Sequence, residues 1–393
     1  MPKRLIFKKF ARRLKKAYYR ILGFLGSVIF ALGRILRLIP RIRPYSTDEV
    51  RRILIIRMDR IGDVVLSTPT FKAVRQHFRE AKIYILVRSY TKDLVIGNPD
   101  INKIIIFEDK MPFLKEIINK IREIRKENID FAIVLHPNFW PNLLAFASGA
   151  KYRLGYDAAG SGFFLTKKVK DSRPTNPRHE VEVTLDVVRT LGIDTTDKKL
   201  YIPISEEGER FADFFLRDNN CESVDNLIAI HPGGYYHYTH WSVKGFAQVS
   251  DYLIEHFAAK VVIVGSPLEQ VLANEVVSFM KNSPIIAIGT TLTQLISLLK
   301  RCKLFIGNSS GPMHIASASG VPVVAIFGNI HPADHYRHWG TWGEANIVVS
   351  KELNCSDCQP ADCLRLDCLR LITPQEVIKA AETLLNKIQI NKN

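Results

Sequence analysis

The chain has 393 residues, of which 47% are hydrophobic, and it carries a formal net charge of +16. This length predicts two domains of ordinary size, each able to bury its own core. Residues 1–44 hold 13 Lys and Arg and neither Asp nor Glu, which leaves +3 for the remaining 349 residues. A nearly neutral body with one basic tail argues against a nucleic-acid-binding surface.

The basic segment 1–44 has an uncharged apolar centre, Ile21 to Leu32. A membrane-spanning helix needs about 20 apolar residues, so this run is too short unless Arg20 and Arg34 snorkel. A basic amphipathic helix lying on an anionic membrane surface fits better. A membrane anchor, a signal peptide and a disordered basic arm are the alternatives.

Alternating apolar runs and amphipathic segments then predict a doubly wound parallel sheet over residues 50–205. The expected strands are 53–57, 82–87, 103–107 and 131–135, and the expected helices are 63–78, 111–127 and 180–192. Residues 158–178, rich in Gly, Lys, Arg and Pro, are expected to form a surface loop near an acceptor.

A carboxylate, Asp63, stands where the first expected strand passes into its helix. Ligands of open α/β sheets bind at the carboxyl ends of the strands, so Asp63 can face a cleft. It can equally complement the helix dipole. Asp59, four residues earlier, is interpreted as a surface or structural carboxylate.

A second unit of the same kind is predicted over residues 206–350. Its expected strands are 227–231, 261–265, 285–288, 303–306 and 322–326, and its expected helices are 243–257, 268–281, 291–300 and 312–319. Residues 351–393 form a Cys-rich segment and a last helix, whose start is a capping box of Thr373 and Glu376 around Pro374.

The loop Ser309-Ser310-Gly311 joins a strand to a helix in this second unit. Such a helix start offers free N–H groups and a positive dipole end to a phosphate. A plain structural loop is the alternative, and His314 in the first turn can be a ligand or a packing residue.

Together these segments resemble glycosyltransferase family 9, the ADP-heptose:lipopolysaccharide heptosyltransferases. The matching residues are 53–57, 62–65, 68–69, 231–234, Trp241 with Phe246, 264–265 with Glu269, 307–314 and 322–328. The resemblance covers roughly residues 52–385, with the motifs in family order. It implies an α/β fold of GT-B architecture, in which two Rossmann-like domains face a cleft.

The resemblance further implies an inverting transferase that moves a sugar, expected to be heptose from ADP-heptose, to the lipopolysaccharide inner core. Asp63 matches the family aspartate proposed as the base. The implied donor-binding residues are Gly62, Gly233, Gly234, Thr239, Trp241, Glu269, Ser309, Ser310, Gly311 and His314. Glu269 would contact the nucleoside, its alternative being a helix N-terminal carboxylate. No cofactor or catalytic metal is expected.

Two positions depart from the family pattern. Thr239 stands where many members carry a Lys, and Ser309 stands where many carry an Asp. His237, His240 or Lys244 could supply part of the missing positive charge. The donor therefore stays open, with three alternatives: a transferase using another nucleotide sugar, a nucleotide-sugar epimerase, or a non-catalytic sugar- or lipid-binding homologue.

Four cysteines, Cys355, Cys358, Cys363 and Cys368, are spaced closely enough to bind one structural zinc. Two disulfides or free thiols are the alternatives, and Cys302 is expected to be a buried thiol. The last helix can return to the first domain, as it often does in GT-B proteins.

Export would separate such an enzyme from cytoplasmic nucleotide sugars. We therefore expect a cytoplasmic protein associated peripherally with the inner membrane. Its partners would be the donor, the lipopolysaccharide core acceptor and, through residues 1–44, an anionic membrane surface. No nucleic acid is expected.

Overall fold

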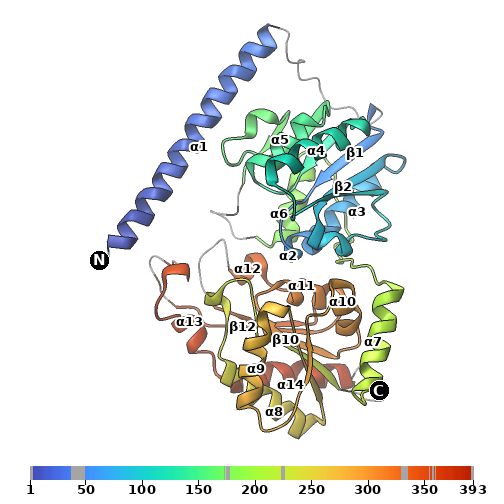
Figure 1. Cartoon of the computed structure of the whole chain (residues 1–393), viewed down its shortest axis with the longest axis vertical. Coiled ribbons are helices and arrows are strands. Elements are labelled where there is room, and N and C mark those ends of the chain that lie inside the picture. Colours follow the sequence, from blue (N-terminus) through green and yellow to red (C-terminus); the bar gives the residue numbers. More distant parts are fainter. Residues whose placement is uncertain are drawn as a thin grey trace.

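The computed structural model describes residues 3–36, 49–171, 173, 178–222, 226–328, 335–353, 355, 358 and 360–390. These residues form two α/β units, with a long helix lying beside the first unit (Figure 1). Each unit contains a six-stranded sheet whose neighbouring strands are all parallel.

The first sheet has the strand order β3-β2-β1-β4-β5-β6. Its strands are β1 (Arg52–Ile56), β2 (Lys82–Arg88), β3 (Lys103–Phe107), β4 (Phe131–Val134), β5 (Tyr152–Tyr156) and β6 (Lys167–Val169). The helices around it are α2 (Ile61–Leu66), α3 (Thr68–His77), α4 (Phe113–Lys126), α5 (Phe139–Ala147) and α6 (Glu180–Arg189). Residues 53–56 are wholly buried, as expected for a strand covered by helices on both faces.

Three details of this unit differ from the sequence prediction. The helix expected over 63–78 is divided at Ser67, whose hydroxyl donates to the carbonyl of Asp63, and α3 begins at the next residue, with Pro69 in its first turn. The segment 158–178, expected to be a loop throughout, contains the short strand β6. Helix α5 and strand β5 were not predicted.

The second sheet has the strand order β12-β11-β10-β7-β8-β9. Its strands are β7 (Leu227–His231), β8 (Lys260–Gly265), β9 (Ile285–Ile288), β10 (Leu304–Asn308), β11 (Val323–Phe327) and β12 (Asn346–Ser350). The helices are α7 (Glu206–Asp218), α8 (Val243–Phe257), α9 (Gln270–Phe279), α10 (Leu292–Lys300), α11 (Gly311–Ala318), α12 (Tyr336–Trp339), α13 (Asp367–Arg370) and α14 (Pro374–Ile390).

Helix α14 begins with the predicted capping box, since the Glu376 carboxylate accepts from the Thr373 N–H and hydroxyl. The expectation that this helix returns to the first domain is wrong. It packs against α8 and strands β10, β11 and β12. Val377, Ala381 and Leu384 are buried in the core of the second unit, which accounts for this placement.

Helix α1 (Lys3–Ile35) packs against the short helix η3 (Gly162–Phe164) of the first unit. Gly23 lies against the backbone of Gly160, where an added Cβ would come within 3.3 Å of the Gly160 Cα. Phe30 contacts the rings of Phe146, Phe163 and Phe164.

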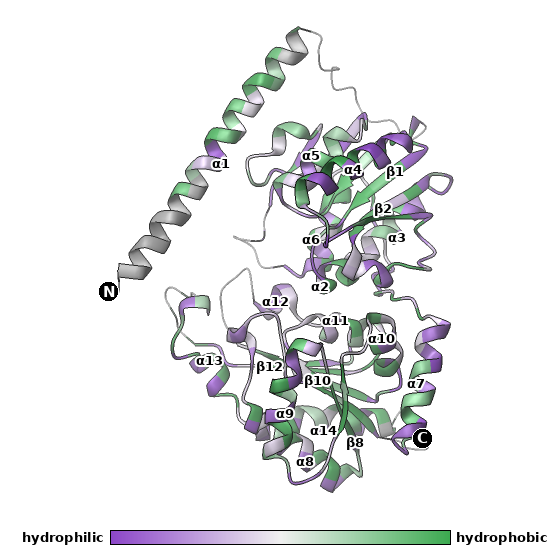
Figure 2. Cartoon of the chain, viewed as in Figure 1, coloured by the Kyte–Doolittle hydropathy of each residue, from purple (hydrophilic) through white to green (hydrophobic). Residues whose placement is uncertain are grey.

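Several of the apolar side chains that the structure describes on α1 are exposed. They are Leu14, Tyr18, Ile21, Phe24, Leu25, Val28, Ile29 and Leu32. Figure 2 shows these apolar positions interrupted by polar ones along the helix. Among the helices of the described residues, none is both long and apolar enough to cross a membrane.

The two units meet where the carboxyl ends of their central strands face each other. Helix α2 lies at the edge of the first unit and packs against α11 of the second (Figure 1). The side chain of Ile61 adjoins Gly311, and the ring of His314 adjoins Gly62. We call this contact region the junction. The arrangement confirms the expected α/β fold of GT-B type.

Candidate functional site

Strand order places the site at two switch points. In the first sheet β1 is paired with both β2 and β4, and in the second sheet β10 is paired with both β7 and β11. Ligands of doubly wound sheets bind where the strand order reverses, beside the carboxyl ends of such strands. The loops that follow β1 and β10 are therefore the expected ligand-binding loops, and both lie at the junction.

A fully buried arginine, Arg57, organises the end of β1. Its Nη2 lies 2.7 Å from Oε1 of Glu180 and 3.3 Å from Oδ1 of Asp63, and its Nη1 lies 3.2 Å from Oδ2 of Asp59. Burial alone would lower the pKa of Arg57, but the three carboxylates outweigh it and raise that pKa. The guanidinium thus stays charged and fixes three acidic side chains in one place.

Asp63 occupies the first turn of α2. Its Oδ2 accepts from the backbone N–H of Arg60 at 3.2 Å, and its side chain is 15% exposed. Burial, followed by the negative charge of Asp59, raises the pKa of Asp63 to about 7, although Arg57 opposes this shift. A carboxyl group with such a pKa can accept a proton near neutral pH, which an ordinary aspartate does poorly.

Asp59 was interpreted as a surface or structural carboxylate, and the structure places it inside, with 14% of its side chain exposed. Burial raises its pKa despite the charge of Arg57. No described residue provides a hydrogen-bond partner for its Oδ1. The same holds for Nδ1 of His136, which follows β4 and whose pKa burial lowers to about 4.

Glu180, at the start of α6, was missed by sequence reasoning. It is fully buried, and His338 of α12 places its Nε2 3.1 Å from Oε2 of Glu180. Burial raises the pKa of Glu180, but the close contact with His338 and the charges of Arg57 and Arg173 hold it at about 2. An anion on the first unit is therefore stabilised from the second unit as well.

The loop that follows β10 in the second unit builds its part of the site from neutral polar groups. Asn308 ends β10 and is fully buried. Its Nδ2 donates to the carbonyls of Pro232 and Gly233, and its Oδ1 accepts from the N–H of Trp241. One amide side chain therefore holds both ends of the 232–241 loop.

Ser310 and Glu269 are brought together through His231 at the end of β7. The Ser310 hydroxyl lies 3.1 Å from Nδ1 of His231, and Oε1 of Glu269 lies 3.3 Å from Nε2 of the same ring. Burial raises the pKa of Glu269, but the hydrogen bond and charge of His231, with the N–H and hydroxyl of Ser266, lower it to about 2. Gly233 packs directly on Glu269, where a Cβ would clash.

The start of α11 lies opposite α2. Ser309 is partly exposed, and its N–H donates to the carbonyl of Ile326. His314 is 5% exposed, and burial lowers its pKa to about 3, so the ring is neutral. No described residue provides a partner for its Nδ1. Gly62, Gly311 and His314 are thus gathered at the junction, and their contact with a donor stays a prediction.

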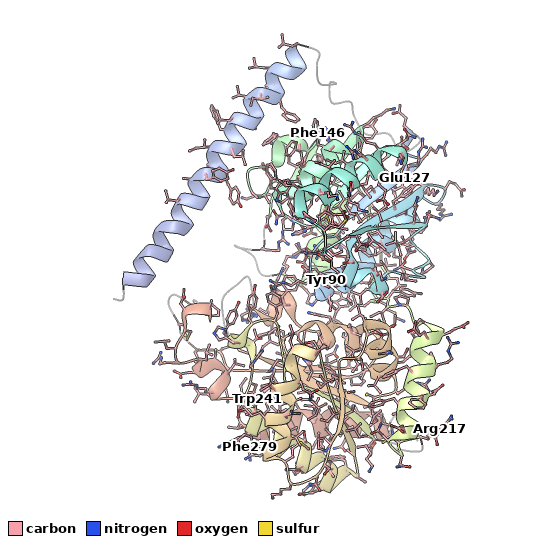
Figure 3. All side chains as sticks on the ribbon, in the orientation of Figure 1. Tyr90, Glu127, Phe146, Arg217, Trp241 and Phe279 are labelled. Carbon is pink, nitrogen blue, oxygen red and sulfur yellow. The ribbon has the colours of Figure 1, made fainter. Side chains whose placement is uncertain are left out.

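The side chains of Thr239 and Trp241 contact other residues of the second unit. The Thr239 hydroxyl donates to the carbonyl of Tyr236 and packs against Gly234. Trp241 is 3% exposed, its indole N–H donates to the carbonyl of Ile372, and it lies within the second unit (Figure 3). Both side chains shape the 232–241 loop, and their contact with a donor stays a prediction.

The expected thiol Cys302 is buried, as predicted, whereas Cys355 and Cys363 are exposed. Among the residues that the structure describes, no three His, Cys, Asp or Glu side chains are arranged to hold a metal ion. A structural zinc on Cys355, Cys358, Cys363 and Cys368 stays a prediction.

Comparisons with known proteins agree with this fold. The family model described as glycosyltransferase family 9 (heptosyltransferase) matches residues 117–368. The lipopolysaccharide core heptosyltransferase OpsX of Haemophilus influenzae is 23% identical over 296 residues, which are 74% of this chain and 82% of that protein.

Two solved structures show the same fold. The glycosyl transferase family 9 protein of Veillonella parvula superposes with a TM-score of 0.78 at 28% identity, covering 88% of this chain and all of the other. ADP-heptose lipopolysaccharide heptosyltransferase II of Escherichia coli superposes with a TM-score of 0.71 at 21% identity, covering 86% and 99%. Since the family model matches more than half of its residues, the chain belongs to glycosyltransferase family 9 and is a glycosyltransferase.

Proposed function

We propose that this chain transfers heptose from ADP-heptose to the inner core of lipopolysaccharide, with inversion at the anomeric carbon. The observation that carries the proposal is the junction, where Asp63, with a pKa of about 7, lies on the helix that faces the start of α11. A proton acceptor and a phosphate-binding helix end are the two components that glycosyl transfer from a nucleotide sugar requires. The names of the relatives supply the sugar and the acceptor.

In the proposed reaction Asp63 accepts the proton of an acceptor hydroxyl as that oxygen attacks the anomeric carbon. The bond between this carbon and the diphosphate oxygen breaks, and ADP leaves with the electron pair. Attack from the face opposite ADP inverts the configuration. The unpartnered Oδ1 of Asp59 and Nδ1 of His136 lie near Asp63 and offer an acceptor and a polar ring atom to the incoming sugar.

The donor would lie on the second unit. N–H groups at the start of α11, with the hydroxyls of Ser309 and Ser310, would bind the diphosphate. The neutral ring of His314 offers a further polar contact through its unpartnered Nδ1. Glu269, held ionised by His231, would accept hydrogen bonds from ribose hydroxyls. These groups stabilise the leaving group in the proposal without a divalent metal.

Helix α1 would hold the enzyme on the membrane that carries its acceptor. Its exposed apolar side chains and the basic composition of residues 1–44 suit an anionic lipid surface on the cytoplasmic side. Deletion of residues 1–44 should reduce sedimentation with anionic vesicles while turnover of a soluble core fragment is largely kept. Unchanged vesicle binding would contradict this part of the proposal.

The function is tested by measuring nucleoside diphosphate release from a panel of nucleotide sugars, with and without a deacylated lipopolysaccharide core. Acceptor-dependent ADP release from ADP-heptose, with a heptosylated product, is expected. Release from a different donor would replace the sugar assignment. An epimerised donor without a glycoside product, or binding without release from any donor, would contradict the transfer reaction.

A further inference from the structure

The loops that would receive the diphosphate contain no permanently charged basic side chain. Segments 231–243, 265–269 and 307–314, which follow β7, β8 and β10, contain neither Lys nor Arg. The departing diphosphate carries at least two negative charges, and its charge grows as the glycosidic bond breaks. Helix-end N–H groups supply only partial positive charge. A full positive charge must therefore come from another part of the chain.

Two of the three nearby cations that the sequence suggested, Lys244 and His240, do not fill this role. Lys244, on α8, places its Nζ 4.9 Å from the ring centre of Phe279, which lies in the second unit away from α2 (Figure 3). His240 uses its Nε2 for the carbonyl of Gly234 at 2.9 Å. Arg57 is fully buried among three carboxylates and has no exposed surface to offer.

Arg60 of the first unit reaches this part of the second unit. Its Nη2 donates to the hydroxyl of Tyr236 at 2.7 Å, and its guanidinium carbon lies 4.1 Å from the ring centre of Tyr235. Both tyrosines directly follow Gly233 and Gly234 in the 232–241 loop. The next residue, Ile61, adjoins Gly311 at the start of α11. Arg60 therefore lies between the glycine loop and the helix end.

We propose that Arg60 is the cation that neutralises the donor diphosphate, supplied by the first unit to a group bound on the second. This inference rests on the proposed function. A guanidinium has five N–H donors in a planar fork that suits phosphate oxygens, and Tyr236 occupies only one. The tyrosine rings stabilise the positive charge of the guanidinium by cation–π contact, and the remaining N–H donors of Arg60 stay available.

The same residue is connected to the base. The backbone N–H of Arg60 donates to Oδ2 of Asp63, so the residue that binds the diphosphate through its side chain orients the base through its backbone. Donor binding and base positioning are thereby coupled across the junction. Because the negative charge of the diphosphate is larger in the transition state than in the bound donor, Arg60 contributes more to kcat than to donor affinity.

The test compares Arg60→Gln, Arg60→Lys and the matched control Arg79→Gln, which removes a charge from an exposed position of the same unit. Calorimetry measures the affinity of each protein for ADP and for adenosine. Arg60→Gln should weaken ADP binding about 10- to 100-fold, as expected for loss of a charge-assisted hydrogen bond, while adenosine binding stays within about twofold of wild type. Arg60→Lys should restore part of the ADP affinity and of kcat, and the control should match wild type.

Two results would overturn the assignment of Arg60. One is wild-type ADP affinity and kcat in Arg60→Gln, and the other is an equal loss of ADP and adenosine binding, which indicates a structural role. If wild type binds another nucleoside diphosphate instead of ADP, the donor of the proposed function is wrong, and the same comparison with that nucleotide decides the role of Arg60. If it binds none, both proposals fall.

Discussion

The loops after β1 and β10 occupy equivalent places in two sheets of similar topology, yet their chemistry differs. The first holds Arg57, Asp59 and Asp63, three ionisable side chains brought into contact by burial. The second holds Asn308, Ser309 and Ser310, which are neutral, and the side chains of Asn308 and Ser310 are hydrogen-bonded to residues 231–233 at the end of β7. The same fold therefore carries a charged cluster on one side of the junction and a neutral cradle on the other.

The difference separates two chemical tasks. Close packing of carboxylates shifts their pKa values and prepares one of them to move a proton. A rigid, neutral loop at a helix start offers N–H groups to an anion without placing a competing charge there. Each of the following predictions alters one side and asks whether only that side's task is affected.

The largest effect is expected at Asp63. Asp63→Asn keeps the shape of the side chain but removes the proton acceptor, so kcat should fall about 10²- to 10⁴-fold. ADP affinity, to which Asp63 contributes no proposed contact, should stay within about twofold of wild type. Single-turnover rates and calorimetry measure the two quantities separately. A matched loss of both would mean that the two tasks are not divided as proposed.

Asn308→Ala should act mainly on the structure of the second side. The substitution leaves the carbonyls of Pro232 and Gly233 and the N–H of Trp241 without their partner, and should lower the free energy of unfolding by about 1–3 kcal/mol. Urea denaturation measures this change. Asn274→Ala, at an exposed position of α9, is the control and should be nearly neutral. Equal stability of the two variants would contradict the role of Asn308.

Asp59→Asn should change the pH dependence of the first side. The charge of Asp59 raises the pKa of Asp63, so its removal should lower that pKa and move the acid limb of the kcat profile to lower pH by roughly one unit. Rates at saturating donor across the acid range measure the shift. A move of the limb to higher pH would show that Asp59 does not act on Asp63 through its charge.

Ser310→Ala should have the smallest effect. The substitution removes one neutral hydroxyl, which contacts His231 and would contact a phosphate oxygen, so donor affinity should fall no more than about tenfold. The acid limb of the kcat profile should stay in place. A loss of more than about a hundredfold would show that this side contributes more than neutral hydrogen bonding.

Much of this architecture could be predicted from the sequence. Buried apolar runs such as those in 227–231 and 303–306 predicted the central strands, because strands covered on both faces contain few polar residues. The positions of Asp63 and of residues 309–311 at strand ends predicted which loops form the candidate site. Strand β6 was missed because it is only three residues long and includes two exposed lysines.

Contacts between segments that are far apart in the sequence could not be predicted from it. Glu180 is 123 residues from Arg57, and no local pattern connects them. The pairing of Arg60 with Tyr236 spans 176 residues and joins the two units. The amphipathic pattern of α14 predicted a packed helix. It did not predict which unit the helix packs against, because an apolar face does not specify its partner. The sequence placed Lys244 on an expected helix, but it could not predict that the side chain lies over the ring of Phe279.

The central claim is that proton transfer belongs to the buried carboxylate on the first side of the junction. It is tested most directly by the pH dependence of the single-turnover rate of wild type with saturating donor. Since Asp63 must be deprotonated and its pKa is about 7, the rate should level off above that pH and fall about tenfold per unit below it. A rate that stays constant down to about pH 5, where an ordinary aspartate is still ionised, would contradict the account.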